Sequence, residues 1–397
     1  MAFDQHRRKD WWRTVGRLAW FSVNGRACTF LARGDRFAMA PRTHRYPNRH
    51  TSVADGTDPW QRGATSAPTR WLSGGVSGRI ARSAEWRRAG RAVKLADMTT
   101  STYTHKYLIG VDGGGSGTRV VLAGTEGIEL ARATGGPSGL ALGVERAWEA
   151  IEAACLRAFD TAGLPFEWSA CSLGCGLAGV NHAGWLAQFR ATAPQGCALA
   201  VESDAFTTLL GAHGGEPGVI VALGTGSIAA SLDAGGQFEI AGGYGFPSGD
   251  EASGAWLGLR AVVHLQHVLD GRAPADDWSA ALLACTDATD RDSLVVWLCA
   301  ANQTDYAALA PTVFEHRKHP FAARLLEEAG REIVKMVSAL DPDQALPVAL
   351  CGGLAEPLTP FVPDELRRRL RLPLADSAAG ALQLARHAAS RKSAHEG

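Results

Sequence analysis

One pattern occurs twice in this chain and limits the folds that are open to it: an apolar strand, a glycine-rich turn and a second apolar strand. The first copy reads YLIGVDGGGSGTRVVLA over residues 107–123, and a third β-type segment, IELARATGG, follows it. The second copy, PGVIVALGTGSIAASLDAGGQFEIAGG, begins about 110 residues later. This repeat predicts two related supersecondary units, each opening with a three-stranded meander.

Other elements surround these two units. Apolar residues at helical spacing predict helices over 146–162 and 182–193, and residues 254–340 are mostly helical in pattern. Buried strands are expected within 168–180, at 197–202 and in LPVALCGGLAEPL, and a closing helix over 380–388. With 46% hydrophobic residues, a chain of this length can build the cores of two domains.

Residues 1–97 differ in composition from the rest. They hold 19 Lys and Arg against 7 acids, whereas the remainder holds 21 against 33, and they contain six of the twelve tryptophans. This part lacks sustained periodicity. We expect a basic extension that is disordered or not native, with Met98 as the working start; an interaction arm and a targeting peptide are the alternatives. No run approaches the roughly 18 apolar residues of a membrane span.

Cysteine and histidine spacing gives no metal motif. The eight cysteines lie in apolar sequence without CxxC pairs, which predicts reduced core thiols. Cys171 and Cys175 could be metal ligands, but their strand-like sequence favours burial. Four histidines are expected to be ordinary surface or core residues: His182, His213, His264 and His267.

The glycine turns predict phosphate binding. Without Cβ atoms, their backbone N–H groups form a nest that can bind an anion, although either turn alone could be a plain hairpin. Asp112 ends the first strand and is placed to bind Mg²⁺ through water, since magnesium prefers one or two carboxylates plus substrate phosphates. Four hydroxyls could donate to phosphate oxygens: Ser116, Thr118, Thr225 and Ser227.

Seven ordered motifs resemble those of the BadF/BadG/BcrA/BcrD ATPase family, which includes N-acetylglucosamine kinases and bacterial glucosamine kinases. They are GVDGGGSGTR, GLAGV, ESDAF, VIVALGTGSIA, GGYGFPSGDEASG, LCGGLAEPL and DSAAGAL. The resemblance covers residues 107–388 and implies an α/β fold of two ribonuclease-H-like lobes, as in actin, with ATP in the cleft between them. We expect the N-terminal lobe over 106–215 and the C-terminal lobe over 216–397, with the final helix returning to the first lobe.

The resemblance also implies which residues bind the nucleotide. The two hairpins become phosphate loops, and the CGG motif lies near the adenosine. The expected set is Gly113, Gly114, Gly115, Ser116, Thr118, Gly224, Thr225, Gly226, Ser227, Gly352 and Gly353, with ATP and Mg²⁺ as cofactors.

Phosphoryl transfer further needs a base near the attacking hydroxyl. Asp204, after the strand in CALAVESDAF, resembles the aspartate that amino-sugar kinases place beside the sugar 6-hydroxyl; the alternative is a helix N-cap. GGYGFPSGDEASG resembles a sugar-contacting segment, although its acids could simply favour a helix N-terminus. The implied substrate residues are Asp204, Gly243, Tyr244, Gly245, Asp250 and Glu251.

One departure concerns the acetylated sugar. In GGPSGLALG, Leu140 stands where the animal amino-sugar kinases have an asparagine that contacts the sugar. This argues against N-acetylglucosamine in particular and leaves sugar phosphorylation intact.

The expected function is therefore an ATP-dependent phosphotransferase acting on the 6-hydroxyl of glucosamine or N-acetylglucosamine. One alternative is an ATPase activator that carries an iron–sulfur cluster between two subunits, and such a protein needs cysteines at the dimer axis. The other alternative is a non-catalytic sugar sensor, in which the catalytic base would be lost, whereas Asp204 is present here. We expect a cytoplasmic homodimer with a small sugar substrate and neither nucleic-acid nor membrane partners.

Overall fold

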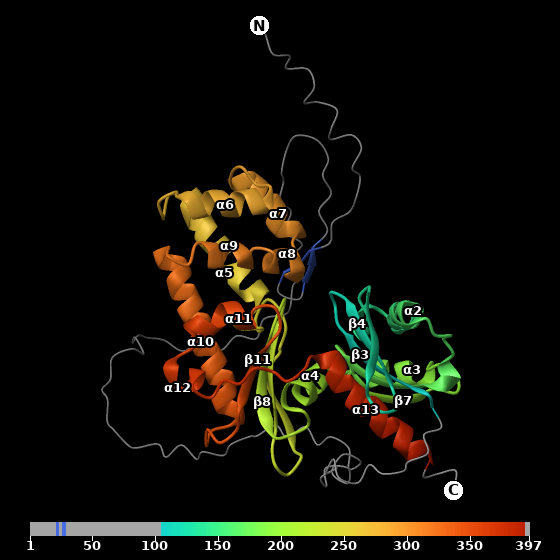
Figure 1. Ribbon diagram of the computed structural model, residues 1–397. Coiled ribbons are helices and arrows are strands. Elements are labelled where there is room, and N and C mark those ends of the chain that lie inside the picture. Colours follow the sequence, from blue (N-terminus) through green and yellow to red (C-terminus); the bar gives the residue numbers. More distant parts are fainter. Residues whose placement is uncertain (1–20, 24–25, 29–104, 394–397) are drawn as a thin grey trace, which may run out of the picture. The chain divides into compact units, whose positions relative to one another are not determined.

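The computed structural model describes residues 21–23, 26–28 and 105–393 (Figure 1). The chain divides into one unit over Met1–Gly75 and a second over Val76–Gly397. In the first unit, β1 (Phe21–Val23) and β2 (Arg26–Cys28) pair antiparallel. The other expectations for residues 1–97 concern residues outside the described ranges.

A five-stranded sheet with the order β5-β4-β3-β6-β7 forms the first half of this unit. The strands β3 (Tyr107–Gly113), β4 (Thr118–Gly124) and β5 (Glu129–Gly135) form the predicted antiparallel meander. The strands β6 (Cys171–Leu177) and β7 (Ala198–Glu202) continue the sheet parallel to β3.

A four-stranded sheet repeats the same scheme, with the order β10-β9-β8-β11. The strands β8 (Gly218–Leu223), β9 (Ser227–Leu232) and β10 (Phe238–Gly242) form a second antiparallel meander, and β11 (Val348–Cys351) pairs parallel with β8. Two copies of one supersecondary unit, predicted from the sequence repeat, are confirmed.

Alternation along β3 assigns the two faces of the five-stranded sheet. Ile109 and Val111 join a core with α2 (Val144–Ala162), whereas Leu108 packs on the opposite face against α13 (Ser377–Ser393). The helix α3 (Ala183–Ala191) also packs against α2. The period-2 pattern of the strand thus accounts for helices on both sides of the sheet.

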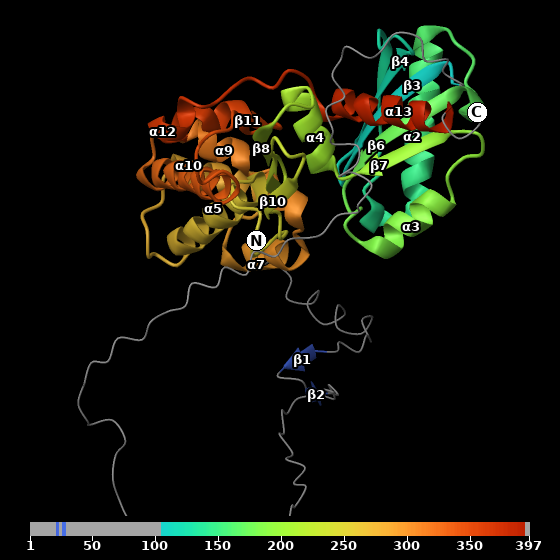
Figure 2. The same cartoon turned by 90° about the horizontal axis from the view of Figure 1, so that it is seen from below.

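The helix α13 lies close against the five-stranded sheet because the sheet offers glycines there (Figure 2). A Cβ on Gly110 would lie 2.1 Å from the carbonyl oxygen of Ala378, and one on Gly174 would lie 2.0 Å from that of Ala381. On its other side α13 contacts α4 (Asp204–His213). These close approaches fix where the first residues of α13 lie.

The helix α4 connects the two sheets. Ala205, Leu209 and Ala212 pack against Ile220 and Ala230 of the four-stranded sheet. The same helix contacts α13 and β6 of the five-stranded half. The first residue of α4, Asp204, is thereby held at the junction of the two halves.

Helices fill the rest of the second half and pack on the other face of its sheet, where Val219 and Val221 join the largest core. The helices of this part are α5 (Gly254–Leu269), α6 (Asp277–Thr286), α7 (Arg291–Ala300), α8 (Gln303–Ala307), α9 (Ala310–Glu315), α10 (Pro320–Leu340), α11 (Ala355–Leu358) and α12 (Asp364–Arg367). Three short 3₁₀ helices complete the description: η4 (Leu140–Leu142), η5 (Trp168–Ala170) and η6 (Thr359–Phe361).

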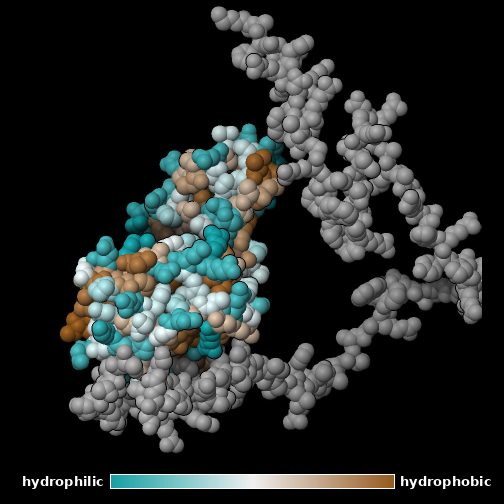
Figure 3. Space-filling view, turned by 90° about the vertical axis from the view of Figure 1, so that its right-hand side faces the viewer, coloured by the Kyte–Doolittle hydropathy of each residue, from teal (hydrophilic) through white to brown (hydrophobic). Residues whose placement is uncertain are grey.

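Most large apolar side chains are buried in these cores. On the face shown in Figure 3, hydrophilic and hydrophobic residues alternate, and the hydrophobic residues lie in small separate groups. Among the described residues, none of the helices is both long and apolar enough to cross a membrane.

Candidate active site

Asp112 lies near the end of β3 with its side chain 16% exposed. Its Oδ2 is 3.5 Å from Nε of Arg119, the cross-strand neighbour on β4. Burial raises the pKa of Asp112, while the Arg119 charge and a hydrogen bond from Ser377 act in the opposite direction. Arg119 therefore offsets the burial of this carboxylate only in part, which is a setting that favours a bound cation.

Asp204 is the first residue of α4, and Ser203 is the N-cap. The Ser203 hydroxyl accepts a hydrogen bond from the N–H of Phe206, while Asp204 Oδ1 accepts one from the N–H of Ala205 at 2.8 Å. The capping role that was the alternative for Asp204 belongs to Ser203. The Asp204 carboxylate therefore keeps an oxygen for another partner.

Asp112 and Asp204 influence each other electrostatically. Burial is the main cause that raises the pKa of Asp204, and the negative charge of Asp112 raises it further. Two neighbouring carboxylates with raised pKa values, where the two sheets meet, are typical of a functional site.

The start of α13 completes this cluster. Ser377 lies within hydrogen-bond reach of Asp112, and its hydroxyl is 2.9 Å from that of Thr207 on α4. Asp376 accepts a hydrogen bond from the N–H of Ala379, which caps α13, and it forms an ion pair with Arg132 on β5. The N-termini of α4 and α13 thus converge on the two carboxylates, and their positive dipole ends favour anionic groups there.

Sequence reasoning placed residues 376–381 in the returning segment but missed Ser377 as a partner of Asp112. The available signal was Asp-Ser directly before the apolar run of the closing helix, which is typical of a helix N-terminus.

The first glycine loop contains glycines of two kinds. A Cβ on Gly113 would lie 2.2 Å from the Ser138 hydroxyl, so this glycine is needed for packing within the protein. Gly114 and Gly115 have nothing within 4 Å of a Cβ, so their backbone faces open space. The turn is closed by the Gly114 N–H, which donates to Gly117. Gly114 and Gly115 therefore leave room for a ligand beside the loop, although the Gly114 N–H already serves the turn.

The second loop is held by the N-terminus of α5. The N–H groups of Gly254 and Ala255 donate to the carbonyl oxygens of Gly224 and Thr225. A Cβ on Gly226 would lie 2.6 Å from Asp250 Oδ2, so Gly226 is also a packing requirement.

The CGG motif also contains one glycine that is required for packing and one that has open space beside it. Gly352 has φ +90° and a Cβ there would lie 2.4 Å from the Leu223 carbonyl oxygen, whereas Gly353 has open space around it. The first glycine of the motif permits the turn after β11, and only the second is positioned to face a ligand.

Two of the four predicted phosphate donors have other partners. The Thr118 hydroxyl is buried and lies 2.6 Å from the Gly136 carbonyl oxygen and 2.7 Å from the Ser138 hydroxyl. The Ser227 hydroxyl is buried and donates to the Glu251 carbonyl oxygen at 2.6 Å. Each hydroxyl has one proton to donate, so in this conformation both hold the loops in shape. Ser116 and Thr225 are more exposed and remain the predicted donors.

Asp250 anchors the loop between β10 and α5. It is 5% exposed and has φ +59°. Its Oδ1 accepts from the N–H of Gly245, and its Oδ2 accepts from Nε2 of Gln303. Burial raises the pKa of Asp250, and the Gly245 hydrogen bond opposes this. Sequence reasoning missed Gln303, which follows Asp250 by 53 residues.

The same loop presents Tyr244, a residue that is 88% exposed, between Gly243 (φ +71°) and Gly245 (φ +87°). Glu251 is half-buried and contributes its backbone carbonyl to Ser227. Leu140, at the position of the expected asparagine, is buried in the core with α2, and its N–H donates to Ala178.

Cys171 and Cys175 are fully buried on β6, and burial raises the pKa of Cys171 to about 12. Burial also raises the pKa of Cys175. Both are core thiols, as the sequence predicted, and neither is available at a subunit surface.

Comparisons with known proteins agree with this geometry. The sequence pattern of the BadF/BadG/BcrA/BcrD ATPase family matches residues 109–382. A glucosamine kinase of Vibrio cholerae is 30% identical over 282 residues, which cover 70% of this chain and 95% of the relative. An N-acetylmuramic acid/N-acetylglucosamine kinase of Clostridium acetobutylicum is 26% identical over 305 residues, 71% of this chain and 98% of the relative.

A solved structure from Chromobacterium violaceum, provisionally named an N-acetylglucosamine kinase, is 46% identical and has a TM-score of 0.69. It covers 71% of this chain and 99% of its own. The match confirms the expected two-lobe α/β architecture. By sequence pattern, relatives and fold, the chain is a member of the BadF/BadG/BcrA/BcrD ATPase family, whose activity uses ATP.

Proposed function

We propose that this protein is an ATP-dependent kinase that phosphorylates an amino sugar, glucosamine or N-acetylglucosamine, at its 6-hydroxyl. The observation that carries the proposal is the pair Asp112 and Asp204, two half-buried carboxylates with raised pKa values at the junction of the halves, in a chain whose relatives are sugar kinases. Glucosamine is favoured because Leu140 is a core residue and provides no amide for an N-acetyl group.

Asp204 is the proposed general base. Its raised pKa brings it closer to neutral pH than an ordinary aspartate, which improves a base that must accept the proton of the 6-hydroxyl as phosphoryl transfer proceeds. One carboxylate oxygen is held by the N–H of Ala205, which orients the group. The position of Asp204 at the start of α4 therefore both orients the carboxylate and raises its pKa.

The residues around Asp112 fit a magnesium ion. Carboxylate oxygens are the ligands that Mg²⁺ prefers, and a cation would offset the burial of Asp112. When bound, Mg²⁺ neutralises charge on the transferred phosphate. Asp112 would hold it through water, and the open backbone of Gly114, Gly115 and Gly353 would lie against the nucleotide.

The loop 243–250 is the proposed sugar-binding segment. Tyr244 offers an exposed aromatic ring against which the apolar face of a sugar ring can pack. Asp250 fixes the loop through Gly245, and its remaining acceptor capacity could serve a sugar hydroxyl.

The test is an ADP-release assay with ATP and Mg²⁺ over glucosamine, N-acetylglucosamine, glucose, mannose and 6-deoxyglucosamine. The expected result is the highest kcat/KM with glucosamine and no turnover with the 6-deoxy analogue. Equal turnover with the 6-deoxy sugar, or no turnover with either amino sugar, would refute the proposal.

The iron–sulfur activator is the alternative, but no observation favours it, since Cys171 and Cys175 are buried core thiols. We propose a cytoplasmic homodimer that binds neither nucleic acid nor membranes, consistent with the acidic composition of residues 98–397. Light scattering coupled to size-exclusion chromatography measures the oligomeric state directly.

A further inference from the structure

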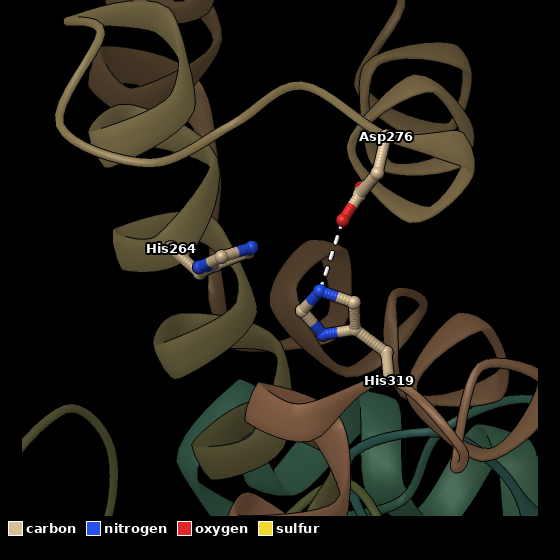
Figure 4. Close-up of side chains that lie close together, drawn as sticks. All are labelled: His264, Asp276 and His319. Atoms are coloured by element: carbon tan, nitrogen blue, oxygen red, sulfur yellow. Dashed lines mark ion pairs between the residues drawn. The ribbon is translucent and has the colours of Figure 1, made fainter.

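A cluster of potential metal ligands lies away from the residues described above. His264 on α5, Asp276 at the N-cap of α6 and His319 at the N-cap of α10 each place one ligand atom within 4.8 Å of the others (Figure 4). His264 follows Gly254, at the start of α5 beside the second glycine loop, by ten residues. At about 1.5 Å per residue this places the cluster about 15 Å from that loop along the helix.

The histidine on α5 is buried and lacks a partner for one of its nitrogens. His264 is 6% exposed, and its Nε2 is buried without a hydrogen bond among the described residues. Figure 4 shows a ring nitrogen of His264 directed towards Asp276 and His319. A buried imidazole nitrogen without a hydrogen-bond partner destabilises the fold, so its presence calls for an explanation such as a bound ion.

The other two members already lie close together. His319 Nε2 is 2.9 Å from Asp276 Oδ2. In a tetrahedral zinc site with Zn–N and Zn–O bonds of about 2.0–2.2 Å, ligand atoms lie about 3.3 Å apart. The present spacing therefore needs only small side-chain shifts to surround an ion.

The neighbouring groups hold the histidines in place. The Trp278 ring centroid lies 5.0 Å from those of both His264 and His319, and Phe321 stacks on His264 at 4.6 Å.

We propose that His264, Asp276 and His319 bind one divalent transition-metal ion of the Zn²⁺ class, which joins α5, α6 and α10. Two imidazoles and one carboxylate are a donor set suited to zinc, and the fourth position would take water. The proposal goes beyond the kinase function, because it concerns a metal site outside the nucleotide and sugar residues.

One hydrogen bond must change when the metal binds. Nδ1 of His319 now accepts the N–H of Phe321 at 3.2 Å, which places the ring proton on Nε2 beside Asp276. Ligation through Nε2 moves the proton to Nδ1 and removes this cap. The loss of this one N-cap hydrogen bond is offset by the new bond from Nε2 to the metal.

The site can be tested with variants that preserve the local structure. Asp276→Asn retains an oxygen that can cap α6 through the Ser279 N–H. His264→Phe retains an aromatic ring in contact with Trp278 and Phe321. His267→Gln, on the same helix but outside the cluster, is the matched control.

The experiment is a calorimetric titration of ZnCl₂ into the chelator-treated full-length protein, with melting temperatures measured in parallel and Co²⁺ absorption as a spectroscopic probe. The zinc stoichiometry of the parent and of His267→Gln should exceed that of His264→Phe and Asp276→Asn by one ion. If the stoichiometry is equal, the Kd for zinc should be at least tenfold lower in the parent and in His267→Gln. Zinc should raise the melting temperature of the first two only, and the Co²⁺ band should be of the nitrogen and oxygen type.

Identical zinc stoichiometry and affinity in all four proteins would overturn the proposal. So would a Co²⁺ spectrum dominated by thiolate ligation that persists in the variants, which would assign the metal to exposed cysteines such as Cys285 and Cys299. A variant that melts lower but binds zinc like the parent would show a structural ion pair only, and would also refute it.

Discussion

At the scale of single residues, the two aspartates of the site are held at a cost to stability. Burial raises the pKa of both Asp112 and Asp204, which means that the folded state disfavours their charged forms. A protein retains such groups when its function requires them, since an asparagine would fit with less desolvation.

Asp112→Asn tests this trade-off. Because the folded pKa of Asp112 lies above its unfolded value of 3.8, the carboxylate's penalty is absent well below pH 3.8, grows as the pH rises through the folded pKa, and is constant above it. The variant should therefore melt at or above the wild-type temperature at pH 7, and the difference should shrink as the pH falls from the folded pKa through 3.8.

The same variant should show turnover reduced by about 10²-fold or more with sugar affinity largely unchanged, because the lost carboxylate orients hydrated Mg²⁺ on the phosphates. Melting curves across pH, with kcat and sugar Kd at pH 7, make the measurement. A variant that melts clearly lower at pH 7, or that loses sugar affinity as strongly as turnover, would contradict the assignment.

At the scale of elements, two neighbouring residues at the start of α4 have different roles: Ser203 caps the helix, and Asp204 is the proposed base. Ser203→Ala removes the cap, so it should lower stability by about 1 kcal/mol while kcat stays within a few-fold of wild type. Thermal or urea unfolding beside kcat provides the check. Unchanged stability would show that the Ser203 hydroxyl is not the cap that holds α4.

The glycines needed for packing and the glycines proposed to face the nucleotide can likewise be distinguished by substitution. Gly174→Ala places a Cβ against the backbone of α13 and should destabilise by about 1–3 kcal/mol or more. Gly114→Ala meets nothing within 4 Å and should leave the melting temperature unchanged but raise KM for ATP. The measurements are unfolding curves and the KM for ATP of both variants. A destabilised Gly114→Ala, or a stable Gly174→Ala with a raised KM for ATP, would refute the assignment of Gly174 to packing and Gly114 to ligand binding.

The sequence predicted the elements better than the side-chain partners. The two meanders, the parallel strands and the closing helix follow from local periodicity, which the strand and helix geometry dictates. Thr118 and Ser227 were expected to face phosphate, but their buried hydroxyls bind backbone carbonyls that belong to later segments. Such partners depend on tertiary contacts and leave no local pattern.

At the scale of the whole molecule, the described part of the second unit begins at His105. His105 is buried and its Nε2 lies 3.1 Å from the Gly196 carbonyl oxygen. The cluster of His264, Asp276 and His319 could not be predicted, because three separate helices bring its members together. The junction of the two halves, in contrast, was implied by the family motifs.

A chain that begins at Met98 should therefore fold with the wild-type melting temperature and retain full kcat. The family pattern begins at residue 109, and the first strand of the five-stranded sheet at Tyr107. The comparison uses the full-length protein as its control. An insoluble or inactive shortened chain beside an active full-length protein would show that residues 1–97 belong to the catalytic domain.

The most direct test of the account is the turnover of Asp204→Asn with the preferred amino sugar. Asparagine keeps the shape and one acceptor but removes the basicity, so kcat should fall by about 10²–10⁴-fold while ATP still binds. Because Ser203 is the cap and burial disfavours the Asp204 charge, the melting temperature should stay the same or rise. A kcat within twofold of wild type would remove Asp204 from the mechanism and contradict the account.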